Sequence, residues 1–202
     1  MSRPPRVDTF LNWPSGLTGA SLAGGFLALV LASHGELAWA AGVVVLCGIL
    51  DSLDGVVARK MSVCSPFGEQ LDSLADIVAF GVAPALMLYV ALDSTPVVAV
   101  ATCVVFVLCG AWRLARFALI EDRHRFFLGL PIPPAGVITA SLAALTPPAG
   151  VLVAITLVLS VLMISDLPFP TFGTIGRLLR RNRPVEEEPA MATPVDLDRN
   201  AA

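Results

Sequence analysis

The sequence predicts an all-α integral membrane protein with six transmembrane helices, and three observations support this fold class. Of the 202 residues, 56% are hydrophobic and only 14% are charged, against roughly 25% charged residues in soluble domains. The mean hydropathy is +0.80. The apolar residues gather in runs near the roughly 20 residues that a helix needs to cross a bilayer. This composition excludes a disordered chain, a collagen-like repeat, a disulfide scaffold and a nucleic-acid reader with a free basic face.

Charged residues or prolines bound each of six apolar runs. We expect membrane spans at about 15–33, 37–58, 71–92, 96–119, 129–146 and 149–165. The second run is apolar as far as Leu50 and continues into a polar stretch that begins at Asp51. Short joints at 34–36, 93–95 and 146–148 separate consecutive spans, which favours closely packed antiparallel pairs of helices.

The basic residues are placed asymmetrically along this pattern. All 13 lysines and arginines lie before the first span, at the end of the second, at or after the end of the fourth, or after the sixth. Because cytoplasmic loops collect Lys and Arg, we expect a multi-pass protein of the cell membrane with both termini in the cytoplasm. The alternative is a cleaved signal peptide with Arg3 and Arg6 as its charged region, although Thr18 and Ser21 interrupt the apolar run.

The last part of the chain differs in composition from the rest. After Arg183 it contains three consecutive glutamates together with several prolines and alanines. Such a segment cannot bury enough apolar surface to fold. We therefore expect one membrane domain over residues 1–176 and a disordered cytoplasmic tail over 177–202.

Four carboxylates lie where apolar runs meet polar residues, at positions 51, 54, 72 and 76. Carboxylates within membrane helices are costly and mark functional sites by default. If both segments are helical, Asp51 and Asp54 share one face and Asp72 and Asp76 share another, so the two faces can form a cup. Oxygen ligands of this kind suit Mg²⁺, Mn²⁺ or Ca²⁺. Two such ions could clamp a diphosphate, and we expect a two-metal site.

Residues between the carboxylates suit a diphosphate ligand. Gly55 and Gly68 leave room for a bulky group to approach the backbone, Arg59 can bind a phosphate with its planar fork, and Ser65 can add a hydroxyl donor. The alternatives are a polar helix pair used for packing or an ion path in a transporter. The absence of an internal repeat and the position of the cluster beside Lys60 favour a site that a soluble nucleotide reaches.

This run resembles the signature of the CDP-alcohol phosphatidyltransferase family, which is Asp-x-x-Asp-Gly-x-x-Ala-Arg, eight residues, Gly, three residues, Asp, three residues and Asp. The chain has every fixed residue of that signature: Asp51, Asp54, Gly55, Ala58, Arg59, Gly68, Asp72 and Asp76. The resemblance implies a six-helix membrane fold that is usually a homodimer. It also implies a reaction in which an alcohol attacks the β-phosphoryl group of a CDP-activated lipid and CMP leaves.

The same resemblance implies a role for each matching residue. The four aspartates would bind two divalent cations, Mg²⁺ or Mn²⁺, with Ca²⁺ as a possible occupant, and Asp76 would accept the proton of the attacking hydroxyl group. A second stretch, residues 14–18, resembles the family's other CDP-lipid-binding segment more loosely. The residues that would hold the CDP-lipid are then Pro14, Thr18, Gly55, Ala58, Arg59, Ser65 and Gly68.

Three further stretches, residues 72–84, 113–117 and 129–136, resemble the branch of the family that uses L-serine as the acceptor. That resemblance implies CDP-diacylglycerol and L-serine as substrates and CMP and phosphatidylserine as products. One departure is Ala118, where the branch typically has Asn. The alternatives are glycerol 3-phosphate or an inositol phosphate as the acceptor, and a cation transporter or scaffold without enzymatic activity.

Two features of these stretches suggest an acceptor pocket. Arg113 and Arg116 stand three apart on one helical face, where they could bind an acceptor carboxylate or the lipid phosphate, or could anchor the span at the membrane interface. Pro131 and Pro133 donate no backbone hydrogen bond. We therefore expect the fifth span to begin with a rigid turn, which either shapes the acceptor pocket or is purely structural.

Overall fold

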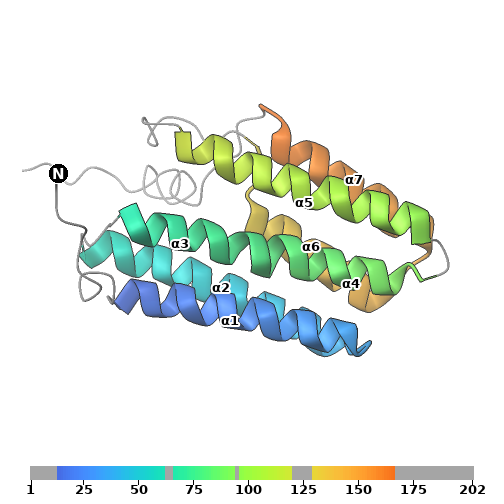
Figure 1. The fold of residues 1–202 in the computed structure, drawn as a ribbon, viewed down its shortest axis with the longest axis horizontal. Helices are drawn as coiled ribbons and strands as arrows, with labels where there is room; N and C mark the ends of the chain where they lie inside the picture. Colours follow the sequence, from blue (N-terminus) through green and yellow to red (C-terminus); the bar gives the residue numbers. More distant parts are fainter. Residues whose placement is uncertain (1–12, 62–65, 94–95, 120–128, 167–202) are drawn as a thin grey trace, which may run out of the picture. The chain divides into compact units, whose positions relative to one another are not determined.

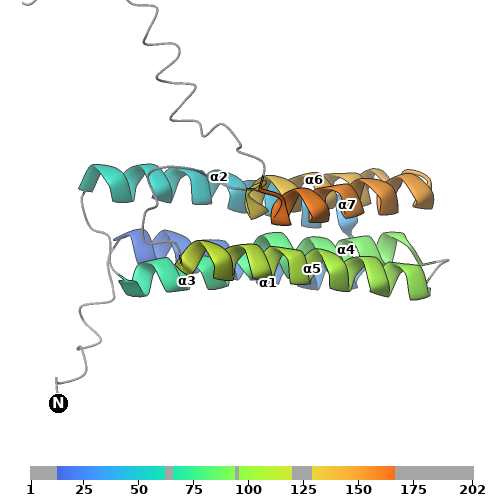
Figure 2. The same ribbon diagram turned by 90° about the horizontal axis from the view of Figure 1, so that it is seen from above.

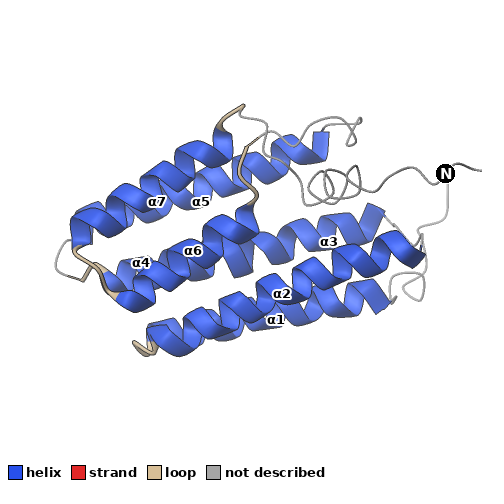
Figure 3. Cartoon of the chain, turned by 180° about the vertical axis from the view of Figure 1, so that it is seen from behind, coloured by secondary structure: helices blue, strands red, loops and turns tan. Residues whose placement is uncertain are grey.

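The computed structural model describes residues 13–61, 66–93, 96–119 and 129–166. Every regular element in these ranges is a helix, and no strand occurs among them (Figure 3). The helices are α1 (Trp13–Ser33), α2 (Leu37–Met61), α3 (Pro66–Asp76), the π-helical segment η2 (Ile77–Val82), α4 (Ala83–Ala91), α5 (Pro96–Leu119), α6 (Ile132–Leu145) and α7 (Ala149–Ile164). The predicted all-α fold class is confirmed for the described residues.

Each of the six expected spans coincides with a helix, and the third consists of α3, η2 and α4 in continuous succession. Helix α2 continues to Met61, and the third helix already begins at Pro66. The predicted tail, residues 177–202, lies outside the described residues.

The fifth span begins later than its apolar run. Gly129 has a φ of +81°, and a Cβ there would lie 2.5 Å from the Met163 carbonyl oxygen. The Leu130 amide donates to the Leu162 carbonyl oxygen at 3.0 Å, and α6 begins only at Ile132. The turn therefore fits closely against the end of α7, which agrees with the rigid entry expected from the prolines.

Three helices are long and apolar enough to cross a membrane, over Gly16–Ser33, Phe67–Ala91 and Val97–Ala118. The apolar helices Leu37–Leu53, Ile132–Leu145 and Ala149–Ile164 are shorter. A helix of 14 residues such as α6 is about 21 Å long, against the ~30 Å of a hydrocarbon core. These lengths and compositions describe a membrane-embedded protein.

The helices lie side by side in two layers. Figure 2 shows α2, α6 and α7 in one layer and α1, α3, α4 and α5 in the other. The two layers meet where α1 packs against α2 and where α5 packs against α7, and α2, α6 and α7 follow one another within the first layer (Figure 1). As a result, residues near the C-terminal end of α2 face residues near the N-terminal end of α3.

Small residues let neighbouring helices approach closely. A Cβ at Gly25 of α1 would lie 2.8 Å from the Ala79 Cα of η2, and a Cβ at Gly136 of α6 would lie 2.4 Å from the Phe80 carbonyl oxygen. Lipid drives helices together weakly, so such backbone contacts supply much of the packing energy. Helices α1 and α6 therefore hold η2 from two sides.

Candidate functional site

Three of the four predicted carboxylates converge. Asp51 lies on α2, whereas Asp72 and Asp76 lie one turn apart on α3, and one carboxylate oxygen from each residue lies within 4.8 Å of the others. Asp76 is buried, and Asp51 and Asp72 are half-buried. The backbone of Asp54 follows one turn after Asp51 on α2, but its side chain lies outside the described part of the structure.

The converging oxygens fit a divalent cation. Carboxylate oxygens are the ligands that Mg²⁺, Mn²⁺ and Ca²⁺ prefer, and the oxygens come from two helices that are fixed by packing. Three partly buried carboxylates repel one another strongly unless a counter-charge lies close by. The donor set therefore fits the metal site that the sequence predicts.

Arg113 of α5 lies beside this acidic cluster. Its guanidinium group is close enough to Asp76 for their charges to interact, and the centre of the group lies 5.9 Å from the centroid of the Phe117 ring. The Arg113 Nε atom is buried and has no hydrogen-bond partner. One of the two predicted acceptor-site arginines therefore lies at the carboxylates.

Arg116 is held elsewhere. Its Nη2 atom forms an ion pair with Asp166, and its Nη1 atom donates to the Ile164 carbonyl oxygen at 3.5 Å. Both partners belong to the C-terminal end of α7 or the residues just after it. Although Arg113 and Arg116 are close in sequence, the structure does not bring them together on one ligand.

The proline turn packs against the helices that carry the site. Pro131 precedes α6 and Pro133 lies in its first turn, while the buried Ile132 side chain fills the space beside Gly81 of η2 and Gly110 of α5. The turn thus contacts the segment just after Asp76 and the segment just before Arg113. A purely structural role explains these contacts as well as a role in the acceptor pocket does.

The remaining predicted site residues are placed only in part. Thr18 is buried on α1 and Gly68 is half-buried on α3. The other positions either lie on α1 or α2 with side chains outside the described set, or lie outside it altogether: Pro14, Gly55, Ala58, Arg59 and Ser65.

The sequence did not reveal the π-helical segment. η2 follows Asp76 directly and accommodates one more residue than regular α-helical pairing would allow. Such segments occur frequently at functional sites. The glycine at 81 is the only local hint, and it does not by itself predict a π-helix.

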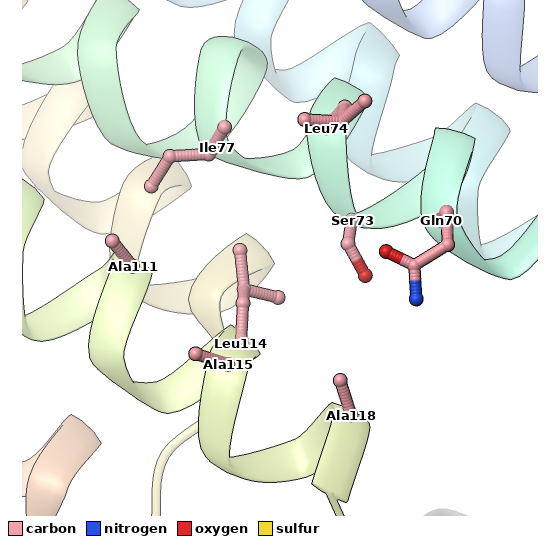
Figure 4. Close-up of a pocket in the computed structure, with 8 residues that line it drawn as sticks. All are labelled: Gln70, Ser73, Leu74, Ile77, Ala111, Leu114, Ala115 and Ala118. Carbon is pink, nitrogen blue, oxygen red and sulfur yellow. The ribbon is translucent and has the colours of Figure 1, made fainter.

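A pocket of about 200 Å³ lies between α3 and α5. Figure 4 shows Gln70, Ser73, Leu74 and Ile77 on one wall and small or apolar α5 side chains, among them Leu114, on the other. The four residues on the first wall share a face of the helix that differs from the face of Asp72 and Asp76. The pocket is therefore separate from the acidic cluster.

An all-helical, membrane-embedded chain with a carboxylate cluster suited to divalent cations defines a class, the membrane proteins with an intramembrane metal-compatible site. The model of the CDP-alcohol phosphatidyltransferase family matches residues 11–165. Since this match spans most of the chain, the protein belongs to that family. The transporter and scaffold alternatives lose their support with this match.

Relatives with curated names resemble the chain over most of its length. A CDP-diacylglycerol–serine O-phosphatidyltransferase of Methanocaldococcus jannaschii is 37% identical over 156 residues, which cover 77% of this chain and 72% of the relative. An archaetidylserine synthase of Methanothermobacter thermautotrophicus is 36% identical over 180 residues, which cover 87% and 77%. A CDP-diacylglycerol–serine O-phosphatidyltransferase of Bacillus subtilis is 41% identical over 125 residues, which cover 61% and 70%.

Proposed function

We propose that the protein transfers a phosphatidyl group from CDP-diacylglycerol to the hydroxyl group of L-serine, forming phosphatidylserine and releasing CMP. The observation that carries the proposal is the convergence of Asp51, Asp72 and Asp76 within a chain of the CDP-alcohol phosphatidyltransferase family. Serine as the acceptor is supported by the names of the relatives, which differ in the lipid but share serine.

In this proposal the four aspartates 51, 54, 72 and 76 hold two divalent cations, Mg²⁺ or Mn²⁺. When bound, such ions neutralise the diphosphate and make a nearby hydroxyl group more acidic. Asp76 accepts the proton of the serine hydroxyl group while the hydroxyl oxygen forms a bond to the β-phosphorus of the CDP-lipid. The bond from that phosphorus to the oxygen bridging the two phosphates breaks, and CMP leaves with the electron pair.

The burial of Asp76 supports its role as the proton acceptor. It is the most buried of the three described carboxylates, so bulk water competes least with the substrate hydroxyl group there. We assign the CDP-lipid to the positions that the family signature marks around the cluster. These are Pro14, Thr18, Gly55, Ala58, Arg59, Ser65 and Gly68.

We propose six membrane spans with the active site facing the cytoplasm. Asp51 lies toward the C-terminal end of α2, Asp72 near the N-terminal end of α3, and Arg113 toward the C-terminal end of α5. Successive antiparallel helices bring these ends to one side, and the joints at 34–36 and 146–148 belong to the other. Because the 13 lysines and arginines avoid those joints, the side of the carboxylates is the cytoplasmic one. The homodimer stays a prediction.

The proposal is tested with purified protein in detergent micelles that contain CDP-diacylglycerol and Mg²⁺ or Mn²⁺. L-serine, glycerol 3-phosphate and an inositol phosphate are offered in turn while CMP release and the lipid product are measured. We expect CMP and phosphatidylserine with L-serine only. A lack of CMP with every alcohol contradicts the enzymatic proposal, and release with glycerol 3-phosphate but not with serine changes the acceptor.

The Asp76→Asn variant keeps the size of the side chain and removes its charge, so we expect loss of turnover by several orders of magnitude with the fold preserved. Ser52→Ala is the matched control, because Ser52 is exposed and its hydroxyl group bonds only to the Gly48 carbonyl oxygen of its own helix at 2.8 Å. Full activity of Asp76→Asn would exclude this carboxylate as the proton acceptor.

A further inference from the structure

The two arginines of α5 differ in what holds them. Arg116 is bound to Asp166 and to the Ile164 carbonyl oxygen, so its guanidinium group is engaged by the protein. Arg113 instead lies toward the acidic cluster, with a buried Nε atom that has no hydrogen-bond partner. A buried donor without a partner costs about 1–3 kcal/mol, and such a group in a native structure calls for an explanation.

The surroundings of Arg113 fix its orientation. Its guanidinium carbon lies 5.9 Å from the centroid of the Phe117 ring, a distance at which the ring attracts the cation. On its other side the group interacts with the charge of Asp76. The long side chain is thus positioned before any substrate binds, which lowers the entropic cost of using it.

The unsatisfied atom also indicates what kind of ligand is missing. The Nε and one Nη of a guanidinium group form a planar fork that matches the two oxygens of a carboxylate. We infer that Arg113 binds the carboxylate group of the acceptor and thereby selects a hydroxy amino acid over an amino alcohol. This inference rests on the proposed function and names the residue that reads the acceptor.

The position of Arg113 next to Asp76 agrees with the size of such an acceptor. In serine the hydroxyl-bearing carbon is separated from the carboxylate carbon by one carbon atom, so both groups reach only neighbouring protein residues. Asp76 would accept the hydroxyl proton, and Arg113 beside it would hold the carboxylate. An acceptor without the carboxylate would leave the Nε atom buried and unpaired, which is the situation in which polar sites discriminate most strongly.

The inference is tested by steady-state kinetics with L-serine and with ethanolamine, which keeps the hydroxyl and amino groups but lacks the carboxylate. We expect Arg113→Gln to raise the KM for L-serine by about tenfold or more, with a smaller change in kcat and an unchanged KM for CDP-diacylglycerol. The preference for L-serine over ethanolamine in kcat/KM should fall by at least about the same factor. Arg113→Lys should recover only part of it, because an ammonium group lacks the fork.

Arg116→Gln serves as the comparison, since the inference predicts that its preference for L-serine over ethanolamine stays within about twofold of the unsubstituted protein. A measurement without any substitution covers the case in which the Arg113 variants do not fold. L-serine methyl ester, whose carboxylate is blocked, should neither react nor compete with L-serine at equal concentration.

The outcomes separate the two proposals. If the unsubstituted protein releases no CMP with L-serine, the proposed function fails. If it does so but Arg113→Gln keeps the full preference for L-serine, or the methyl ester reacts as well as serine, the inference about Arg113 is overturned. A loss of preference in Arg116→Gln but not in Arg113→Gln would assign the carboxylate to the other arginine.

Discussion

Three carboxylates that lie within 4.8 Å of one another repel each other, and the residues around them decide how much of that repulsion remains. Arg113 offsets part of it through Asp76. A single positive charge cannot balance three ionised carboxylates. A cluster of this charge is therefore better matched by divalent cations, each of which brings two positive charges, than by the described side chains alone.

Gly136 is the residue at which α6 approaches η2 most closely. A Cβ there would lie 2.4 Å from the Phe80 carbonyl oxygen and 2.7 Å from the Phe80 Cα, and backbone atoms cannot move aside as a flexible side chain can. We expect Gly136→Ala to destabilise the protein by about 1–3 kcal/mol, measured as a lower thermal unfolding temperature in detergent.

Gly42→Ala is the matched control, because a Cβ at Gly42 of α2 meets no atom within 4 Å. Alanine also favours the helix over glycine by about 0.5–1 kcal/mol, so the control should unfold at the same temperature or higher. Equal unfolding temperatures for the two variants would contradict the close contact between α6 and η2.

Whole helices could be predicted well where charge or proline interrupts an apolar run. The fourth span, expected over 96–119, coincides with α5, because Pro96 opens it and a polar segment follows it. The convergence of Asp51 with Asp72 and Asp76 also followed from spacing, since residues three or four apart share a helical face. The side chain of Asp54 is not described, so its place in the cluster stays a prediction.

The features that could not be predicted depend on contacts between distant parts of the chain. Arg113 and Arg116 have the spacing of neighbours on one face, but their directions are set by Asp76 and by Asp166, which lie on other elements. The π-helical turns of η2 likewise fit against Gly25 of α1 and Gly136 of α6. No local pattern in the sequence encodes these partners.

The extra residue in η2 sets how α3 is rotated relative to α4. Removing one residue from a helix turns the preceding part by about 100° and shifts it by about 1.5 Å. We expect deletion of the exposed Val82 to rotate Asp72 and Asp76 away from Asp51. The result should be loss of Mn²⁺ binding, measured by electron paramagnetic resonance, together with loss of CMP release.

Val82→Ala keeps the number of residues and should retain both properties. Circular dichroism and gel filtration of the deletion variant check that helix content and a single dispersed species are preserved. If the deletion variant binds Mn²⁺ as tightly as Val82→Ala does, the π-helical turns do not position the carboxylates.

At the scale of the molecule, the two ends of the bundle have different chemistry. One end carries the turn at residues 34–36 and the proline-rich joint at 146–148, with no lysine or arginine. Toward the other end lie the carboxylates and the arginines of α5. Asp51 is 14 residues from the start of α2, or about 21 Å, so the cluster lies nearer to the basic side of a ~30 Å hydrocarbon core. A water-soluble acceptor and a lipid-bound donor can both reach that depth.

This arrangement predicts which side of the membrane each end faces. In a variant without native cysteines, the exposed His34 and the tail residue Asn200 are replaced by cysteine one at a time. A membrane-impermeant maleimide should label His34→Cys in intact cells and should label Asn200→Cys only after permeabilisation, because positive residues are retained in the cytoplasm. The reverse pattern would invert the orientation and place the carboxylates outside the cell, away from cytoplasmic nucleotide. Labelling of both cysteines in intact cells would require an odd number of spans and would contradict the six-span topology.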